Sequence, residues 1–227
     1  MNKILGARVL VIAAHPDDET FGCGGMIAKN SLAGGVSDIL IVSEGTSAQF
    51  AHDSDARQTR HQQLLDSAAL LGADRVLHWD YPDMNLDTVP HAKLNAEIAS
   101  VIQEGKYQFV FTHHPHDINK DHQVVARSVM VAARPLPSTR LEGVFAFHTC
   151  SSTEWAYASN AEKFSPNCYQ DITDCLDLKL KACELYVEEL RQYPHPRSIE
   201  AIRNRALVFG ADVGLPAAEG FSLIYWR

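Results

Sequence analysis

The chain has 227 residues, of which 46% are hydrophobic and 21% are charged, and its formal net charge at pH 7 is −8. This is the composition of an ordinary soluble globular protein, and the length suits a single domain over residues 1–227. Because the net charge is negative, the chain gains no general attraction to nucleic acid or to an anionic membrane, and we expect neither as a partner.

The cysteines and the N-terminus indicate a cytoplasmic protein. The five cysteines are odd in number and contain no Cys-x-x-Cys pair. This pattern argues against a disulfide framework and against a cysteine-based zinc site, and it favours reduced, mostly buried thiols. The apolar run near the N-terminus ends at His15-Pro16-Asp17-Asp18, so it is too short to cross a membrane.

Apolar runs alternate with helical patterns through the first 150 residues. We expect strands at residues 8–14, 36–43, 75–79, 107–112 and 143–148. We expect helices at residues 23–33, 54–71, 91–104 and 121–133, and loops at residues 44–53 and 80–90. The alternation predicts an α/β, Rossmann-like fold with a mostly parallel sheet and helices on both faces.

The pattern changes after residue 150. Residues 150–168 have little periodicity and are expected to form a loop, followed by helices at 173–191 and 197–208. The last apolar run, residues 221–226, is typical of an edge strand. We expect the long loops to determine which substrate is accepted, because variable binding residues gather on loops.

An imidazole and three carboxyl groups follow the first predicted strand, in Ala14-His15-Pro16-Asp17-Asp18-Glu19. Open α/β sheets place ligands and catalysts at this end of a strand. His15 and Asp18 are three residues apart around a turn and can face one point, and an imidazole with a carboxylate suits zinc or a similar divalent ion. Asp17 can hold a water nearby. A dinucleotide loop is excluded, because no Gly-x-Gly-x-x-Gly occurs and carboxylates stand where N–H donors are needed.

Four histidines follow the fourth predicted strand, between residues 113 and 122. One further ligand from this segment would complete a site with three protein ligands and an open position, which is typical of catalytic zinc. His122 is the best single candidate, because it starts a helix beside Asp121, which can orient neighbouring groups. His113, His114 and His116, taken singly, are more typical of hydrogen-bonded or exposed imidazoles.

The two segments together resemble the motifs of a known family. Ala14-His15-Pro16-Asp17-Asp18-Glu19 and Asn119-Lys120-Asp121-His122 are similar to the motifs of the PIG-L/LmbE-like zinc-dependent N-deacetylases, which remove acetyl groups from N-acetylated amino sugars and their conjugates. The resemblance covers most of the chain and extends to Leu70-Leu71-Gly72, Tyr81-Pro82-Asp83 and Ala218-Glu219-Gly220-Phe221.

The resemblance implies a role for each residue of the first motif. His15, Asp18 and His122 are expected to hold the metal, and Asp17 is expected to be the general base that activates a water. The expected cofactor is Zn²⁺. Fe²⁺ is the alternative, because a set of two histidines and one aspartate also fits a non-haem iron site.

Further roles are left open by the sequence. Arg57, Arg60 and Asp83 resemble substrate-contacting positions, with a solvated helix face or a loop cap as the alternative. Asn119 stands where many relatives have a histidine, and its amide can donate to an oxyanion but cannot shuttle a proton. The proton donor to the leaving amine is therefore either Asp17 acting twice or His116.

The expected function is metal-dependent removal of an acetyl group from an N-acetylated sugar or sugar conjugate, with a nucleotide-linked sugar left open. Two alternatives remain. One is a metal-dependent hydrolase acting on another amide or carbamoyl bond. The other is a binding module that keeps the metal without catalysis, which Asn119 favours. The partner is expected to be this small molecule, and a homo-oligomer is left open.

Overall fold

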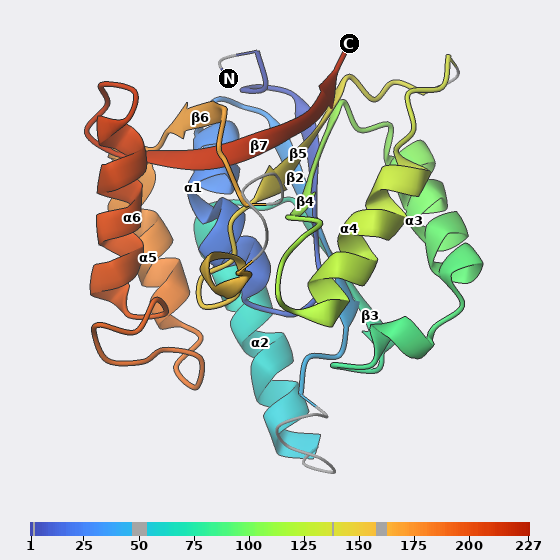
Figure 1. Cartoon of the computed structure of the whole chain (residues 1–227), viewed down its shortest axis with the longest axis horizontal. Helices are drawn as coiled ribbons and strands as arrows, with labels where there is room; N and C mark the ends of the chain where they lie inside the picture. Colours follow the sequence, from blue (N-terminus) through green and yellow to red (C-terminus); the bar gives the residue numbers. More distant parts are fainter. Residues whose placement is uncertain (2, 47–53, 138, 158–162) are drawn as a thin grey trace.

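One sheet forms the centre of the computed structural model, which describes residues 1, 3–46, 54–137, 139–157 and 163–227 (Figure 1). Within these residues the sheet has seven strands in the order β3-β2-β1-β4-β5-β7-β6. The strands are β1 (Arg8–Ala13), β2 (Val36–Ser43), β3 (Arg75–Tyr81), β4 (Phe109–His113), β5 (Gly143–Phe147), β6 (Cys168–Asp171) and β7 (Ala218–Trp226). The first five are parallel, and β7 runs antiparallel to both of its neighbours.

Helices cover both faces of the sheet (Figure 1). They are α1 (Asp18–Leu32), α2 (Ser54–Leu71), α3 (His91–Gly105), α4 (Lys120–Ala132), α5 (Leu176–Glu184) and α6 (Ile199–Ala211). Helices α1, α2, α5 and α6 lie on one face, and α3 and α4 lie on the other. The predicted α/β class, with a mostly parallel sheet between helical layers, is confirmed.

The continuous apolar run of β1 is explained by burial on both sides. Val9, Val11 and Ala13 belong to the core under α1 and α2. Leu10 and Ile12 belong to the core under α3 and α4. A strand that alternates between two cores needs apolar residues at every position, as is typical of central parallel strands.

The boundaries of several elements differ from those predicted. Helix α1 begins at Asp18 rather than at residue 23, and the helix predicted at 173–191 is a short turn followed by α5, which ends at Glu184. The prediction of an edge strand at 221–226 is wrong, because β7 lies between β5 and β6. The edge strand beyond β7 is β6, Cys168–Asp171, which has no apolar alternation to reveal it. Residues 47–53 and 158–162 of the predicted loops lie outside the described residues.

The topology brings the two sequence motifs together. Strand β1 is hydrogen-bonded to β2 on one side and to β4 on the other, both in parallel. The chain moves from β1 to β2 and β3 in one direction and then crosses β1 to form β4, so the strand order reverses between β1 and β4. Such a switch point opens a crevice at the carboxyl ends of the strands, where ligands bind in this class of sheet.

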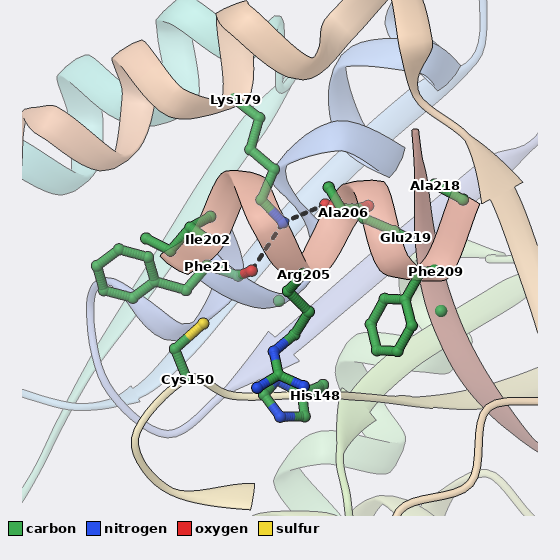
Figure 2. A pocket seen from close by; sticks show the side chains of 12 residues that line it. Phe21, His148, Cys150, Lys179, Ile202, Arg205, Ala206, Phe209, Ala218 and Glu219 are labelled. Carbon is green, nitrogen blue, oxygen red and sulfur yellow. Dashed lines mark hydrogen bonds and ion pairs between the residues drawn. The ribbon is translucent and has the colours of Figure 1, made fainter. Parts of the chain in front are cut away.

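A buried ion pair contacts backbone groups in the middle of α1. The Glu219 carboxylate accepts hydrogen bonds from the backbone N–H groups of Gly25 and Met26, at 2.8 and 2.7 Å. The Lys179 ammonium donates to the Phe21 carbonyl at 2.8 Å and to Glu219 at 2.5 Å (Figure 2). In a regular helix Gly25 N–H would pair with the Phe21 carbonyl. The pair therefore ties α5 and β7 to the helix that carries Asp18.

The cysteines are mostly buried, as predicted. All five cysteines are free thiols, and four of them are buried. Among the described residues, the helices are too short or too polar to cross a lipid bilayer.

We expect Lys179→Met to lower the free energy of unfolding by about 3–5 kcal/mol, because it leaves the Glu219 carboxylate buried without its cation. Urea unfolding measures this change. Lys29→Met is the matched control, since Lys29 pairs with the exposed Asp174, and surface pairs contribute about 1 kcal/mol or less. Equal losses in the two variants would contradict the role given to the buried pair.

Candidate metal centre

Three side-chain atoms converge at the carboxyl ends of β1 and β4. Asp18 Oδ2 lies 3.1 Å from His15 Nδ1 and 3.2 Å from His122 Nε2. The two imidazole nitrogens lie 3.3 Å apart. His15 follows β1, Asp18 opens α1, and His122 lies in the first turn of α4. Asp18 and His122 are buried, and separations of 3.1–3.3 Å leave no room for a water between the three atoms.

Carboxylates stand behind both imidazoles. His122 Nδ1 lies 3.3 Å from Asp117 Oδ1. His15 Nε2 lies 3.2 Å from Asp121 Oδ2 and 3.2 Å from Asp83 Oδ1. Each of these carboxylates can accept the N–H of the ring nitrogen that faces it, and when the rings are neutral the opposite nitrogen of each ring then presents a lone pair to the centre.

The centre therefore consists of three acceptors that face one another. Such a group needs a cation among its atoms, either a proton or a metal ion. Although burial would lower the pKa of both imidazoles, the surrounding carboxylates raise the pKa of His122 to about 9 and that of His15 well above its ordinary value. The site accordingly attracts positive charge strongly.

The separations fit a divalent metal ion. Ligand atoms about 2.0–2.2 Å from one ion lie roughly 3.3–3.6 Å apart in a tetrahedral arrangement and roughly 2.8–3.1 Å apart in an octahedral one. The observed distances of 3.1, 3.2 and 3.3 Å extend from the upper end of the octahedral range to the lower end of the tetrahedral range. Two imidazoles and one carboxylate are also a donor set that zinc and iron accept.

A second group of potential ligands shares His15. It consists of His15, Asp83 and Asp121. In this group His15 Nε2 carries the N–H that Asp121 or Asp83 accepts, and Asp121 also accepts from Leu86 N–H at 3.0 Å. Because that ring nitrogen carries the N–H, it offers no lone pair to an ion, so we favour the first group as the metal site and give Asp83 and Asp121 an orienting role.

Asp17 lies beside the centre in a strained conformation. Its φ angle is 138°, which costs an L-residue roughly 1–3 kcal/mol. The Asp17 N–H donates to Glu19 Oε2 at 2.9 Å, and Asp17 Oδ2 accepts from Arg197 at 2.9 Å. Among the described residues, buried Asp17 Oδ1 has no hydrogen-bond partner. Burial raises the pKa of Asp17 well above its ordinary value, although Arg197 opposes this shift.

Sequence reasoning missed the network that holds Asp17. The Arg197 guanidinium contacts both Asp17 and Glu189, and Arg60 donates to Glu189 at 2.5 Å. Arg60 is buried behind Asp17 and also contacts the Pro16 carbonyl at 3.4 Å. No local pattern marked this network, because the proline-containing segment Tyr193-Pro194-His195-Pro196 falls between the helices predicted at 173–191 and 197–208, and nothing in it links Arg197 to Asp17.

Three further predicted site residues, Asp83, Arg57 and His116, differ in whether they reach the centre. Asp83 reaches His15, as described above. Arg57 is half exposed and forms an ion pair with Asp80, so it does not join the converging group. His116 is exposed on the loop after β4. The structure thus brings Asp83 to the centre and leaves Arg57 and His116 outside its buried part.

Asn119 caps helix α4. Its Oδ1 accepts from the backbone N–H of Asp121 at 2.8 Å, which is the hydrogen bond of an N-cap. The amide nitrogen lies 3.6 Å from Met84 Sδ. Because the oxygen is used in capping, the side chain presents its N–H₂ group to the loop region.

His113 is a neutral buried imidazole. Its Nε2 accepts from the backbone N–H of Ala14 at 2.8 Å, and its Nδ1 lies 3.1 Å from Thr149 Oγ1. Burial and the nearby His122 lower the pKa of His113 well below its ordinary value. Although His113 Nε2 lies 3.5 Å from Asp18 Oδ2, both are acceptors and they form no ion pair. His113 therefore joins β4 to the first motif.

Comparison with known proteins places the chain in a family. The family described as PIG-L: GlcNAc-PI de-N-acetylase matches residues 10–133. The chain belongs to the PIG-L family. The matched region contains His15, Asp18 and His122 together with β4 and all but the first two residues of β1.

Relatives of this PIG-L protein include enzymes with different names. YaiS, an uncharacterized deacetylase of Escherichia coli K12, is 29% identical over 57% of this chain and 69% of its own length. The 4-oxalmesaconate hydratase of Pseudomonas putida KT2440 is 26% identical over 96% of this chain and 89% of its own. The structure of N,N'-diacetylchitobiose deacetylase from Pyrococcus horikoshii with its inhibitor MPG has a TM-score of 0.77 and 21% identity, covering 96% of this chain and 84% of that one. This last likeness shows a shared fold.

We expect Asp117→Asn to weaken zinc binding by the PIG-L protein about 10- to 100-fold, because an amide holds the His122 tautomer less firmly than a carboxylate. Competition with a chromogenic chelator measures the change. Asp87→Asn, at an exposed position of the loop after β3, is the control and should leave the affinity unchanged. An unchanged affinity in Asp117→Asn would contradict the orienting role of Asp117.

Proposed function

We propose that this PIG-L family protein is a zinc-dependent amidohydrolase that removes the acetyl group from an N-acetylated amino sugar or its conjugate. The observation that carries the proposal is the convergence of three acceptor atoms beside Asp17, whose second oxygen is buried and unpartnered among the described residues. The deacetylase names of relatives support the reaction type. The free thiols support a cytoplasmic place of action.

His15, Asp18 and His122 would hold the ion. When bound, a divalent ion supplies Lewis acidity, which makes water more acidic and polarises an amide carbonyl. Asp17 then takes the proton of the attacking water through Oδ1, while Arg197 keeps Oδ2 in place. Burial raises the pKa of Asp17, which makes its carboxylate a stronger base toward the attacking water.

The leaving amine needs a proton and the developing oxyanion needs a donor. We assign the proton to Asp17 acting a second time, because Asp17 is buried in the site whereas His116 is exposed. The Asn119 amide can donate to the oxyanion, because its oxygen is already bound to Asp121 N–H. Asn119 is therefore compatible with catalysis, which weakens the case for a non-catalytic binding module.

The charges near the site favour a neutral sugar over a nucleotide-linked one. Arg60 and Arg197 are both bound to Glu189, and Arg197 is also bound to Asp17. Arg57 is paired with Asp80. These guanidinium groups are therefore committed to carboxylates of the protein itself. Asp83, which is 5% exposed beside His15, is suited to accept a hydrogen bond from a sugar hydroxyl.

A hydratase is the second candidate, because one relative over nearly the whole chain carries that name. Hydration also requires an activated water, so Asp17 and the three acceptors would serve either reaction. The two functions differ in their product. Release of acetate from an N-acetyl sugar supports the deacetylase, whereas water addition to an unsaturated acid without acetate release supports the hydratase.

We expect the zinc-loaded protein to release acetate from a panel of N-acetylated sugars, with Asp17→Asn lowering kcat about 10²- to 10⁴-fold, the range of general acid–base catalysis. Metal analysis should show that Asp17→Asn still binds zinc. Protein stripped by a chelator should be inactive and should recover when zinc is restored. Full activity in stripped protein, or unchanged kcat in Asp17→Asn, would contradict the mechanism.

A further inference from the structure

A buried carboxylate next to the metal centre takes no part in the reaction proposed above. Glu19 lies in the first turn of α1, directly after Asp18, and it is fully buried. Burying a carboxylate costs free energy unless hydrogen bonds satisfy its oxygens. The hydrogen bonds of Glu19 therefore indicate which part of the site this residue serves.

One oxygen of Glu19 holds the backbone of Asp17. Glu19 Oε2 accepts a hydrogen bond from the Asp17 N–H at 2.9 Å. The Asp17 carbonyl accepts from the backbone N–H groups of Thr20 and Phe21, at 3.1 and 2.9 Å. Both backbone polar groups of the proposed base are therefore bound within this turn, and these bonds hold Asp17 at its strained φ angle of 138°.

This conformation keeps the Asp17 side chain out of a competing role. Asp17 is the N-cap of α1, where an aspartate ordinarily accepts hydrogen bonds from the first N–H groups of the helix. The Asp17 side chain makes no such bond. Its Oδ2 accepts from Arg197 at 2.9 Å instead, and its Oδ1 has no hydrogen-bond partner among the described residues. The strained backbone thus leaves one carboxylate oxygen available to a proton.

The other oxygen of Glu19 connects this turn to two further helices. Glu19 Oε1 accepts from the hydroxyls of Tyr186 at 2.6 Å and Thr20 at 2.7 Å. Thr20 Oγ1 lies 2.7 Å from Ser67 Oγ of α2, and Ser67 is the donor because Thr20 gives its one hydroxyl hydrogen to Glu19. All of these side chains are buried. Tyr186 follows the end of α5, so contacts from α2 and from the end of α5 fix the Glu19 carboxylate.

Helix capping alone does not account for this arrangement. In a capping box, the acid that reaches back to the N-cap N–H stands three residues after the N-cap, and the N-cap side chain returns a hydrogen bond. Glu19 stands only two residues after Asp17, and Asp17 returns no bond. A simple cap would require neither the strain at Asp17 nor a buried tyrosine behind the acid.

We propose that Glu19 and Tyr186 are positioning residues that hold Asp17 in the conformation in which its Oδ1 can take a proton from water. The inference rests on the proposed function, in which Asp17 is the base. Tyr186 fixes the Glu19 carboxylate, and Glu19 fixes the Asp17 N–H. Arg197 fixes the second oxygen of Asp17 from the other side. Neither Glu19 nor Tyr186 touches the substrate in this scheme.

The first test measures kcat and KM for acetate release by zinc-loaded variants at Glu19. Glu19→Met removes the acceptor at a similar side-chain volume, and it should lower kcat about 10- to 100-fold, the cost of misplacing a catalytic group by about 1 Å. Glu19→Gln keeps an oxygen for the Asp17 N–H and should largely restore kcat. KM and zinc content should be unchanged in both variants. A wild-type kcat in Glu19→Met would overturn the proposal.

The second test changes only a hydroxyl group, so that it stays decisive if Glu19→Met fails to fold. Tyr186→Phe should lower kcat about three- to tenfold at unchanged KM, a smaller loss because Glu19 keeps its bond from Thr20. Tyr107→Phe is the matched control. Tyr107 is also buried, and its hydroxyl donates to buried Asp38 at 2.6 Å, before the amino end of β4. Equal kcat values in the two tyrosine variants would contradict the role of Tyr186.

The wild-type protein separates a failure of this inference from a failure of the proposed function. If it releases no acetate but hydrates an unsaturated acid, the proposed function is wrong, and the same variants are compared on hydration, which also uses Asp17. If it does neither, hydrogen exchange of the Asp17 amide decides. The positioning stands if Tyr186→Phe speeds this exchange and Tyr107→Phe does not, and it is wrong if both variants exchange at the wild-type rate.

Discussion

Three buried or nearly buried acceptor atoms that face one another within 3.1–3.3 Å are the constraint on which this structure depends. While Asp117 and Asp121 accept the outer N–H groups, neutral imidazoles at His15 and His122 have no hydrogen left to place between themselves and the Asp18 carboxylate. A positive charge must therefore enter the group. The carboxylates behind the imidazoles strengthen this demand, and they also fix which nitrogen of each ring is presented.

The fold produces this convergence by bringing distant segments to one edge of the sheet. The reversal of strand order between β1 and β4 places the first motif against the start of α4. His113 then binds the Ala14 N–H across the two strands. On the other face, the buried Lys179–Glu219 pair anchors α1, so that Asp18 at its first turn is held by the C-terminal part of the chain. The geometry of the site thus depends on contacts between residues that are far apart in the sequence.

The sequence predicted the parallel core and the two motifs because these depend on local patterns. The apolar run of β1 and the spacing of His15 and Asp18 are visible without a structure. Strand β6, Cys168–Asp171, was missed because its pairing with β7 does not require an apolar alternation. Arg197 and Glu189 were missed because charged residues far apart in the sequence reveal no mutual contact. The hydrogen bond from Arg60 to Glu189 was likewise not visible in the sequence, and a substrate contact at Arg60 stays a prediction.

The most direct test of the central claim is the metal content of purified wild-type protein and of His122→Ala after exhaustive dialysis against metal-free buffer. Inductively coupled plasma mass spectrometry gives the number of ions per chain, and circular dichroism confirms that the variant is folded. The convergence of three ligands predicts about one tightly bound divalent ion per wild-type chain and loss of that ion from the variant. A folded His122→Ala protein that retains one ion per chain would contradict the account.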